Sequence, residues 1–385
     1  MRRVLIISMT AGEGHNSASR ALSAYFGSVG VECRVLDMYR FFSRPAGWAT
    51  RNGYVLMVLC ASWLYKAWYK SMDKHRVGGH RTRALRAWSA MHARKFERYI
   101  EEYDPDAIMM MHPFNGILID VIRKRKKIAL PPTVGVLTDF VIHPTWEDSA
   151  DADAITVANR FAVPLVEKKG YDLSVFRETG IPVEARFAAA GDRREARREL
   201  GLDEDTDTVL VMGGSMGRGR FAANVAAIDA LGRDLQIICV SGHNKRAKRA
   251  VDRIAASSRH RILSLGYVGN VDRIMDAADV IVSKPGGLST SEAFAKRLPL
   301  IVVDPIPGHE VKNAELLAER GAVLLTDREH DAASRVREFF EDEALRRSLA
   351  DAVEDVRRPD AARDVCELVI SLMKNEKSPE KETVK

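Results

Sequence analysis

Residues 208–219, TVLVMGGSMGRG, decide the fold that the sequence predicts. The run begins with mostly apolar residues that predict a buried strand, and a glycine-rich loop and a helical pattern follow. In such a unit, the backbone N–H groups of the loop and the helix N-terminus can face a phosphate. We interpret the loop as a phosphate site, with a tight turn that binds no ligand as the alternative. Its residues are Gly213, Gly214, Ser215, Met216 and Gly217.

Two more polar, glycine-rich segments follow predicted strands in the same half: SKPGGLSTSE, residues 283–292, and PIPGHEVKN, residues 305–313. Because parallel strands end at the same edge of a sheet, the three loops predict a nucleotide-diphosphate site there. The carboxylate of Glu292 can accept hydrogen bonds from two ribose hydroxyls, and a charge at a helix N-terminus is the alternative. The predicted donor-site residues of these segments are Lys284, Pro285, Gly286, Gly287, Ser289, Glu292, Gly308, His309, Glu310 and Asn313.

Strands and helices alternate along the whole chain. Strands are expected at residues 3–9, 31–36, 107–111, 133–137, 154–157, 208–212, 235–241, 261–265, 280–283, 300–303 and 322–325. The alternation predicts an α/β protein of two Rossmann-like domains with an interdomain cleft. We expect an acceptor- and membrane-binding domain at residues 1–180 and a donor-binding domain at 181–355. A C-terminal helix that can pack back on the first domain is expected at 356–374, and a disordered, charged tail at 375–385.

Composition fits a two-domain globular protein, with 385 residues of which 46% are hydrophobic and 29% charged. The four cysteines are scattered without metal-ligand or disulfide spacing, which favours a reduced, cytoplasmic compartment. The longest nearly apolar run, residues 54–65, is shorter than the ~20 residues of a spanning helix, so none is expected.

The net charge of +6 is unevenly distributed. Residues 66–98 hold ten Lys or Arg against two acids, and residues 123–127 read RKRKK. Aromatic side chains precede the first basic stretch and include Trp48, Trp63 and Trp68. Aromatic residues beside an apolar helix and a run of cations predict contact with an anionic membrane. The alternative is a helix packed on its own sheet. Nucleic acid is a weaker rival, because binding to a phosphate backbone does not require the apolar helix. We therefore expect a peripheral protein at the inner face of the cell membrane. The oligomeric state is not predicted.

The segment TAGEGH, residues 10–15, leaves the first predicted strand and opens a helix, which places Gly14 and His15 at a helix N-terminus. A histidine there can take a proton from an acceptor hydroxyl, and a capping histidine is the alternative. Asp139, at the end of another strand, is the second candidate catalytic residue: it can orient the His15 imidazole, bind the acceptor or be the base itself, and capping a turn is the alternative. Trp146 lies nearby as an acceptor contact or as packing.

Asp151 and Asp153 match an Asp-x-Asp metal motif, but they lie in the acidic loop EDSADAD, residues 147–153. We interpret this loop as a solvated strand entrance. The sequence holds no other cluster with metal-ligand spacing, so we expect neither a metal nor a cofactor.

Several segments together resemble a known family: TAGEGHNSASRAL, TDFVIHPTW, TGIPV, GGSMG, SKPGGLSTSEA and PIPGHEVKNA, in this order over residues 3–325. They resemble the monogalactosyldiacylglycerol synthase and processive diacylglycerol glucosyltransferase family. These are GT-B enzymes of glycosyltransferase family 28, related to the lipid II N-acetylglucosaminyltransferase. The resemblance implies metal-independent, inverting transfer of a hexose, glucose or galactose, from a UDP-sugar to diacylglycerol or a glycosyl-diacylglycerol.

The resemblance also implies roles for single residues. His15 matches the catalytic or acceptor-side histidine, Val268 in LGYVGNV the residue whose backbone meets uracil, and Glu292 the ribose ligand. His309, Glu310 and Asn313 match the hexose contacts.

Two positions depart from the family. His309 stands where many relatives have Gln, which leaves the donor sugar open, and Glu184 stands where Arg is common, so that one phosphate contact is either missing or supplied by Arg186. Two other functions stay open: an N-acetylhexosamine transferase acting on another lipid, and a non-catalytic UDP-sugar-binding regulator.

Overall fold

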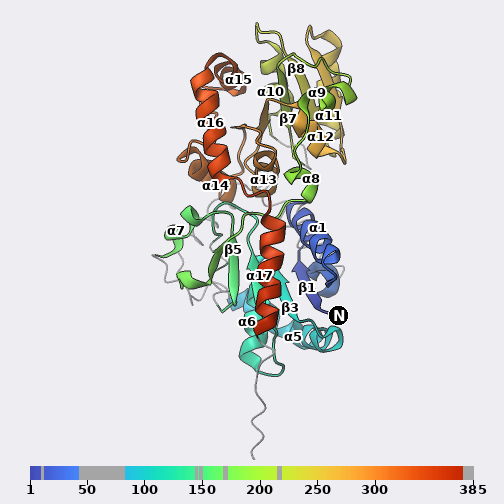
Figure 1. Cartoon of the computed structure of the whole chain (residues 1–385), viewed down its shortest axis with the longest axis vertical. Coiled ribbons are helices and arrows are strands. Elements are labelled where there is room, and N and C mark those ends of the chain that lie inside the picture. The colour runs from blue at the N-terminus through green and yellow to red at the C-terminus, as the bar shows by residue number, and fades with distance from the viewer. Residues whose placement is uncertain are drawn as a thin grey trace, which may run out of the picture. The chain divides into compact units, whose positions relative to one another are not determined.

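The computed structural model describes residues 1–9, 13–42, 83–143, 146, 151–167, 172–214 and 219–375. The chain divides into two compact units, each built around its own sheet (Figure 1). Unit 1 comprises Met1–Glu184 with Asp360–Lys385, and unit 2 comprises Ala185–Pro359. The boundary expected after residue 180 lies a few residues before this division.

Unit 1 contains a six-stranded sheet in the order β2-β1-β3-β4-β5-β6, and every pair of neighbouring strands is parallel. The strands are β1 (Arg3–Ser8), β2 (Glu32–Asp37), β3 (Ala107–Met110), β4 (Thr133–Val136), β5 (Ala154–Val157) and β6 (Phe176–Glu178). The sequence predicted five of them. It missed β6 because the tripeptide Phe-Arg-Glu carries two charges and no apolar run.

The α-helices among the described residues of unit 1 are α1 (Glu13–Ser28), α2 (Met38–Phe42), α5 (Arg83–Tyr103), α6 (Pro113–Arg125), α7 (Pro164–Glu167) and α17 (Ala361–Asn375). α1 and α17 pack together with alternate residues of the sheet (Figure 1). Val4 of β1, Phe26 of α1 and Val369 of α17 are fully buried in this core. The last helix of the chain therefore completes the core of the first unit.

Buried carboxylates join α5 to α6. Asp120 of α6 is 3% exposed and pairs with Arg86 and Lys124, and Glu97 of α5 pairs with Arg125 at 2.7 Å. Burial opposes the charge on Asp120, but hydrogen bonds from Arg86 and Lys124 hold its pKa below the usual range. Basic residues that the sequence assigned to an anionic partner are thus paired inside the unit, which corrects that interpretation for Arg86, Lys124 and Arg125.

Unit 2 contains a second parallel sheet, in the order β12-β11-β10-β7-β8-β9. Its strands are β7 (Thr208–Met212), β8 (Gln236–Val240), β9 (Arg261–Leu265), β10 (Val280–Ser283), β11 (Leu300–Val302) and β12 (Val323–Leu325). Its helices are α8 (Ala185–Ala188), α9 (Arg193–Glu199), α10 (Phe221–Asp229), α11 (Lys245–Ser257), α12 (Val271–Ala277), α13 (Gly287–Ala295), α14 (His309–Ala318), α15 (Ala332–Glu341) and α16 (Glu343–Val356). The prediction of two parallel α/β sheets is confirmed.

Both sheets have a topological switch point beside their first strand. The chain builds β2 on one side of β1 and then β3 on the other, and it likewise builds β8 and later β10 on opposite sides of β7. Connections that leave for opposite faces open a crevice at the carboxyl ends of the two strands, where α/β proteins bind ligands. The switch points therefore lie after β1 and β3 in unit 1, and after β7 and β10 in unit 2.

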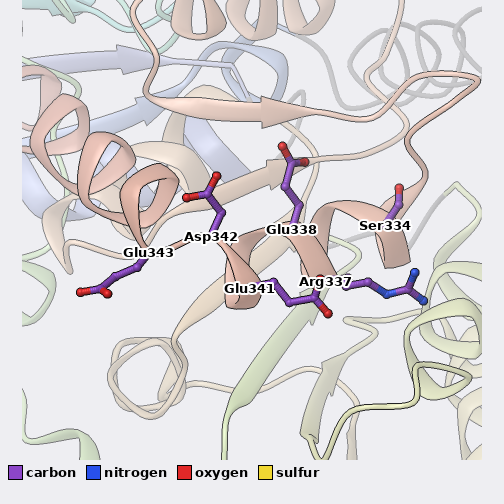
Figure 2. A pocket seen from close by; sticks show the side chains of 6 residues that line it. All are labelled: Ser334, Arg337, Glu338, Glu341, Asp342 and Glu343. Atoms are coloured by element: carbon purple, nitrogen blue, oxygen red, sulfur yellow. The ribbon is translucent and has the colours of Figure 1, made fainter.

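A pocket of about 520 Å³ lies on the surface of unit 2. It is lined by Ser334, Arg337, Glu338, Glu341, Asp342 and Glu343, whose side chains project in different directions from α15 and the start of α16 (Figure 2). Asp342 caps α16 by accepting a hydrogen bond from the Leu345 N–H, and Glu338 pairs with Arg335. Acidic side chains that cap a helix and pair with an arginine do not suit a diphosphate, because their charge repels it.

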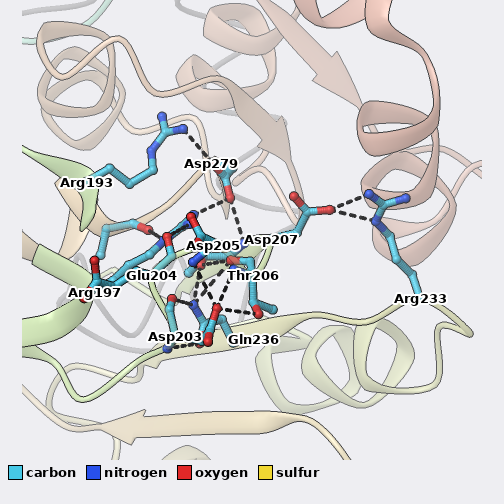
Figure 3. Close-up of polar contacts among 12 residues, drawn as sticks. Arg193, Arg197, Asp203, Glu204, Asp205, Thr206, Asp207, Arg233, Gln236 and Asp279 are labelled. Carbon is cyan, nitrogen blue, oxygen red and sulfur yellow. Dashed lines mark hydrogen bonds and ion pairs between the residues drawn. The ribbon is translucent and has the colours of Figure 1, made fainter. Parts of the chain in front are cut away.

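A network of ion pairs and hydrogen bonds lies at the amino-terminal edge of the unit 2 sheet, the edge opposite the switch point (Figure 3). Arg197 of α9 is 4% exposed, and it donates to the carbonyl of Ala277 at 2.9 Å and to Asp279 at 2.6 Å. Asp279, just before β10, also accepts the N–H of Thr208, the first residue of β7, at 2.7 Å. One buried arginine thus joins a helix to the starts of two strands.

We expect Arg197→Ala to lower the free energy of unfolding of unit 2 by about 1.5–3 kcal/mol, because the Asp279 carboxylate loses a buried charged donor, while Arg193 and the N–H of Thr208 still pair with it. The control is Arg347→Ala, which removes an exposed pair with Glu343 and should cost less than about 1 kcal/mol. All five tryptophans lie in unit 1, so their fluorescence follows that unit in urea, while circular dichroism follows both. Equal dichroism midpoints for the two variants would contradict a structural role for Arg197.

Candidate functional site

The switch point of unit 1 brings together two histidines that follow neighbouring strands of the sheet. His15 lies in the first turn of α1, after β1, and its Nδ1 is 3.1 Å from the Oγ1 of Thr138, which follows β4. The rings of His15 and His112 meet edge to face, with their centroids 5.4 Å apart. The ends of β1, β3 and β4 therefore form one cluster around His15.

His112 is a member of this cluster that sequence reasoning missed. It is the N-cap of α6, and its Nδ1 accepts a hydrogen bond from the N–H of Phe114 at 3.2 Å. Burial, and then the proximity of His15 and His143, lower its pKa well below the usual value, so His112 is neutral at neutral pH. The available signal was a His-Pro pair directly after a predicted strand, which indicates a helix start at the sheet edge.

The other predicted residues of unit 1 lie as follows. Gly14 precedes His15 in α1, and Asp139 is half-buried in the loop after β4, so their predicted roles stay predictions. Trp146 is 3% exposed and packs over Gly135, where an added Cβ would lie 2.9 Å from the indole. This burial fits the packing alternative for Trp146. Trp48, Trp63 and Trp68 lie outside the described residues.

The glycine-rich loop at the switch point of unit 2 is fixed at both ends. Gly213 donates its N–H to the carbonyl of Val240 in β8 at 3.1 Å, and the N–H of Arg220 donates to Asp304 at 2.7 Å. Gly219 has φ +95°, and an added Cβ would lie 2.7 Å from the carboxylate of Asp304, so a side chain there would be strained and crowded. Gly214 lies in the loop with φ +65°. Ser215, Met216 and Gly217 lie outside the described residues.

The loop after β10 leads into α13, whose N-cap residue, Gly286, has no side chain with which to cap the helix N-terminus. Glu292 is 9% exposed and lies in the second turn, beyond the residues on which a helix dipole acts strongly. The helix-charge alternative for Glu292 is therefore disfavoured. Its neighbours Pro285 and Gly287 are buried, whereas Lys284 and Ser289 are half-buried.

The loop after β11 is held by two residues that the sequence assigned to the hexose. Glu310, 8% exposed, accepts the N–H of Ile306 at 2.7 Å, and the buried amide of Asn313 donates to the carbonyl of Pro285 at 3.3 Å. Gly308 has φ +107°, a conformation that favours glycine, and half-buried His309 begins α14. Glu310 and Asn313 thus brace the loops, and their contacts with a sugar stay predictions.

Val268 is half-buried in the segment between β9 and α12. Beside it, the exposed rings of Tyr267 and His243 stack with centroids 4.4 Å apart. Arg186, which the sequence offered as a phosphate contact, pairs with Asp272 of α12 at 3.1 Å and donates to the carbonyl of Gly269. In the structure Arg186 therefore holds the segment that carries Val268.

The second aspartate of the Asp-x-Asp motif, Asp153, has a structural role. Asp153 accepts both the N–H of Thr133, at 2.7 Å, and its hydroxyl, at 2.9 Å, which fixes the start of β4. Among the residues that the structure describes, no three His, Cys, Asp or Glu side chains are grouped as metal ligands. Within the same ranges, no helix combines the length and the apolar character needed to cross a bilayer.

Comparisons with known proteins agree with this arrangement. Residues 15–183 match the family described as monogalactosyldiacylglycerol (MGDG) synthase, and residues 208–357 match the glycosyltransferase family 28 C-terminal domain. The chain is 24% identical over 371 residues to the processive diacylglycerol beta-glucosyltransferase of Bacillus pumilus, covering 96% of this chain and 94% of the relative. It is 23% identical over 370 residues to the protein of the same name from Bacillus subtilis, with 96% and 95% coverage.

Two solved structures share the fold. The structure of Acinetobacter baumannii MurG matches with a TM-score of 0.65 at 16% identity, covering 96% of this chain and all of that one. The S. aureus MnaA–UDP co-structure matches with a TM-score of 0.63 at 14% identity, covering 97% of each chain. The two sheets with their switch points and these matches define a glycosyltransferase of the GT-B class.

Within that class, residues 15–183 belong to the monogalactosyldiacylglycerol synthase family and residues 208–357 to the C-terminal domain of glycosyltransferase family 28. This confirms both the resemblance seen in the sequence and the expectation of a UDP-sugar glycosyltransferase.

We expect Glu292→Ala to weaken UDP binding about 10- to 100-fold, because two ribose hydroxyls lose a charged acceptor worth roughly 1.5–3 kcal/mol. Titration calorimetry with UDP measures the change. The matched control is Glu319→Ala, which removes an exposed carboxylate at the far end of α14 and should leave affinity unchanged. Equal affinities for the two variants would show that Glu292 does not bind the ribose.

Proposed function

We propose that the chain transfers a hexose, glucose or galactose, from a UDP-sugar to the hydroxyl of diacylglycerol or of a glycosyl-diacylglycerol, with inversion at the anomeric carbon. One observation carries the proposal: the two units present complementary chemistry at their switch points. Unit 1 gathers His15 and His112 there, and unit 2 places there a glycine-rich loop and the N-terminus of α13, whose N-cap residue is a glycine. The relatives named processive diacylglycerol beta-glucosyltransferase, matched over nearly their whole length, support diacylglycerol as the acceptor.

The proposed reaction is a single displacement. The acceptor oxygen attacks the anomeric carbon from the face opposite the diphosphate, His15 takes the hydroxyl proton, and UDP leaves with the bonding electrons. Negative charge grows on the diphosphate as the bond breaks. Backbone N–H groups of the loop after β7 and of the first turn of α13 can stabilise this charge, each by about 2–4 kcal/mol if they act as oxyanion-hole donors do. We propose that these groups act without a metal ion.

The acceptor is a lipid, so the proposal includes a membrane-binding surface on unit 1. Arg83, Met91, Arg94 and Arg98 of α5 are exposed at spacings that place them along one helix face, and Met91 is 73% exposed. Cations interleaved with an apolar side chain suit the surface of an anionic membrane. The aromatic and basic residues 43–82, which precede α5 in the sequence, lie outside the described residues. The proposal makes the protein peripheral on the cytoplasmic face of the cell membrane.

We expect the purified protein, given UDP-glucose or UDP-galactose and detergent-dispersed diacylglycerol, to produce a glycolipid whose mass is one hexose greater. NMR of the product should show a β-linkage, because α-linked UDP-hexose inverts in a single displacement. The rate in excess EDTA should equal the untreated rate. An α-linkage would contradict inversion, and loss of activity that Mg²⁺ or Mn²⁺ restores would contradict the metal-free step. Transfer from UDP-N-acetylglucosamine alone would contradict the proposed donor.

We expect Arg94→Glu with Arg98→Glu to weaken binding to vesicles containing anionic phospholipid at least about tenfold, because each cation near such a surface contributes about 1 kcal/mol. The charge-matched control reverses Arg246 and Arg249, which are exposed on α11 of unit 2. Co-sedimentation at low salt measures the binding. Equal binding by the two double variants would exclude this face of α5 from the membrane contact.

A further inference from the structure

His15 is held from two directions. Its Nδ1 is within hydrogen-bonding distance of the Thr138 hydroxyl, at 3.1 Å. The His112 ring meets it edge to face, with an interplanar angle of 88°. One contact comes from the end of β4 and the other from the end of β3, and these strands are neighbours in the sheet. The backbone at the ends of these strands therefore fixes the two side chains, Thr138 and His112, beside the imidazole.

The hydrogen bond to Thr138 decides which nitrogen of His15 can act as a base. A neutral imidazole carries one N–H, and the other nitrogen holds the lone pair that accepts a proton. If the Thr138 hydroxyl donates to Nδ1, the proton lies on Nε2 and neither nitrogen can take another from the acceptor. If Nδ1–H donates to Thr138 Oγ1, the lone pair lies on Nε2. Only the second tautomer can take a proton from a lipid hydroxyl.

We propose that Thr138 and His112 are positioning residues for His15. Thr138 Oγ1 accepts a hydrogen bond from Nδ1–H of His15 and so sets Nε2 as the atom that receives the proton, while His112 holds the plane of the ring. The inference rests on the proposed function, in which His15 is the general base.

His112 suits this role because its own ring is fixed. Its Nδ1 accepts the N–H of Phe114, so the proton of the neutral ring lies on Nε2, and the first turn of α6 holds the ring in place. The lowered pKa of His112 agrees with a neutral ring. A rigid, uncharged neighbour limits rotation of the His15 imidazole without adding a cation beside it.

The tautomer can be observed without any sugar transfer. The full chain is labelled with ¹⁵N-histidine, and the His15 signals are assigned by their loss in His15→Gln. We expect the two-bond ¹H–¹⁵N pattern of the Nδ1–H tautomer in the parent and in Thr138→Ser, and its loss in Thr138→Val. The Nε2–H pattern in the parent would overturn the proposal whether or not the protein transfers sugar to diacylglycerol.

Kinetics test the consequence. We expect Thr138→Val to lower kcat about 10- to 100-fold, since misplacing a catalytic group costs up to about that much, with lipid KM and UDP affinity unchanged. Thr138→Ser should restore kcat to within about threefold of the parent. His15→Ala sets the lower limit, about 10²–10⁴-fold below the parent, as for loss of a general base. A Thr138→Val variant as fast as the parent would overturn the role of Thr138.

His112 needs a variant that separates capping from positioning. His112→Asn keeps a good N-cap for α6 but removes the ring that faces His15. We expect an unchanged melting temperature and a lower kcat. An unchanged kcat would overturn the role of His112. A parent protein that glycosylates no lipid would refute the proposed function, while the NMR result would still decide the tautomer.

Discussion

The pairing of each unit's first strand with parallel partners on both sides is the constraint on which the rest depends. β1 lies between β2 and β3, and β7 lies between β8 and β10. Since the connections on the two sides of that strand leave in opposite directions, the carboxyl ends cannot be covered by one crossover. Each sheet consequently has one crevice, at its switch point, that loop residues line and core side chains do not fill. His15 and His112 occupy that place in unit 1, and Gly213 and Gly286 occupy it in unit 2.

The two edges of the unit 2 sheet differ in their physical chemistry. At the amino edge, Arg197 and Asp279 satisfy each other and the backbone around them, so that edge contributes stability. At the carboxyl edge, Gly219 and Gly308 adopt conformations that favour glycine, and Glu310 holds a turn. The glycines let the loops of this edge turn without a clash of a Cβ atom, and the Glu310 carboxylate fixes the turn at Ile306. Loops of fixed shape at the carboxyl ends of parallel strands favour a binding role for this edge.

The sequence predicted the strands best where an apolar run ends in glycine or a polar loop. β7, β9 and β10 have the predicted bounds. β6 was not predicted, because Phe-Arg-Glu has no apolar pattern. The order of the strands was not predicted, because pairing joins segments far apart in the chain. The candidate site was predicted in its motifs but not in its contacts. His112 was not predicted, because nothing in the local sequence shows that its ring faces His15. Glu310 and Asn313 were predicted as ligand contacts, and the structure shows them bonded to loop backbone. The sequence alone does not separate these two roles, because the same side chains suit both.

We propose that the nucleotide binds at the carboxyl edge of the unit 2 sheet, at its switch point. Hydrogen exchange of the full chain with and without UDP, followed by mass spectrometry, tests it most directly. We expect slower exchange in residues 213–220, 284–292 and 305–313, with the network at 193–207 and the α15–α16 pocket unchanged. Protection at the acidic pocket or at the amino edge, without protection of the three loops, would show that the nucleotide does not bind at the carboxyl edge.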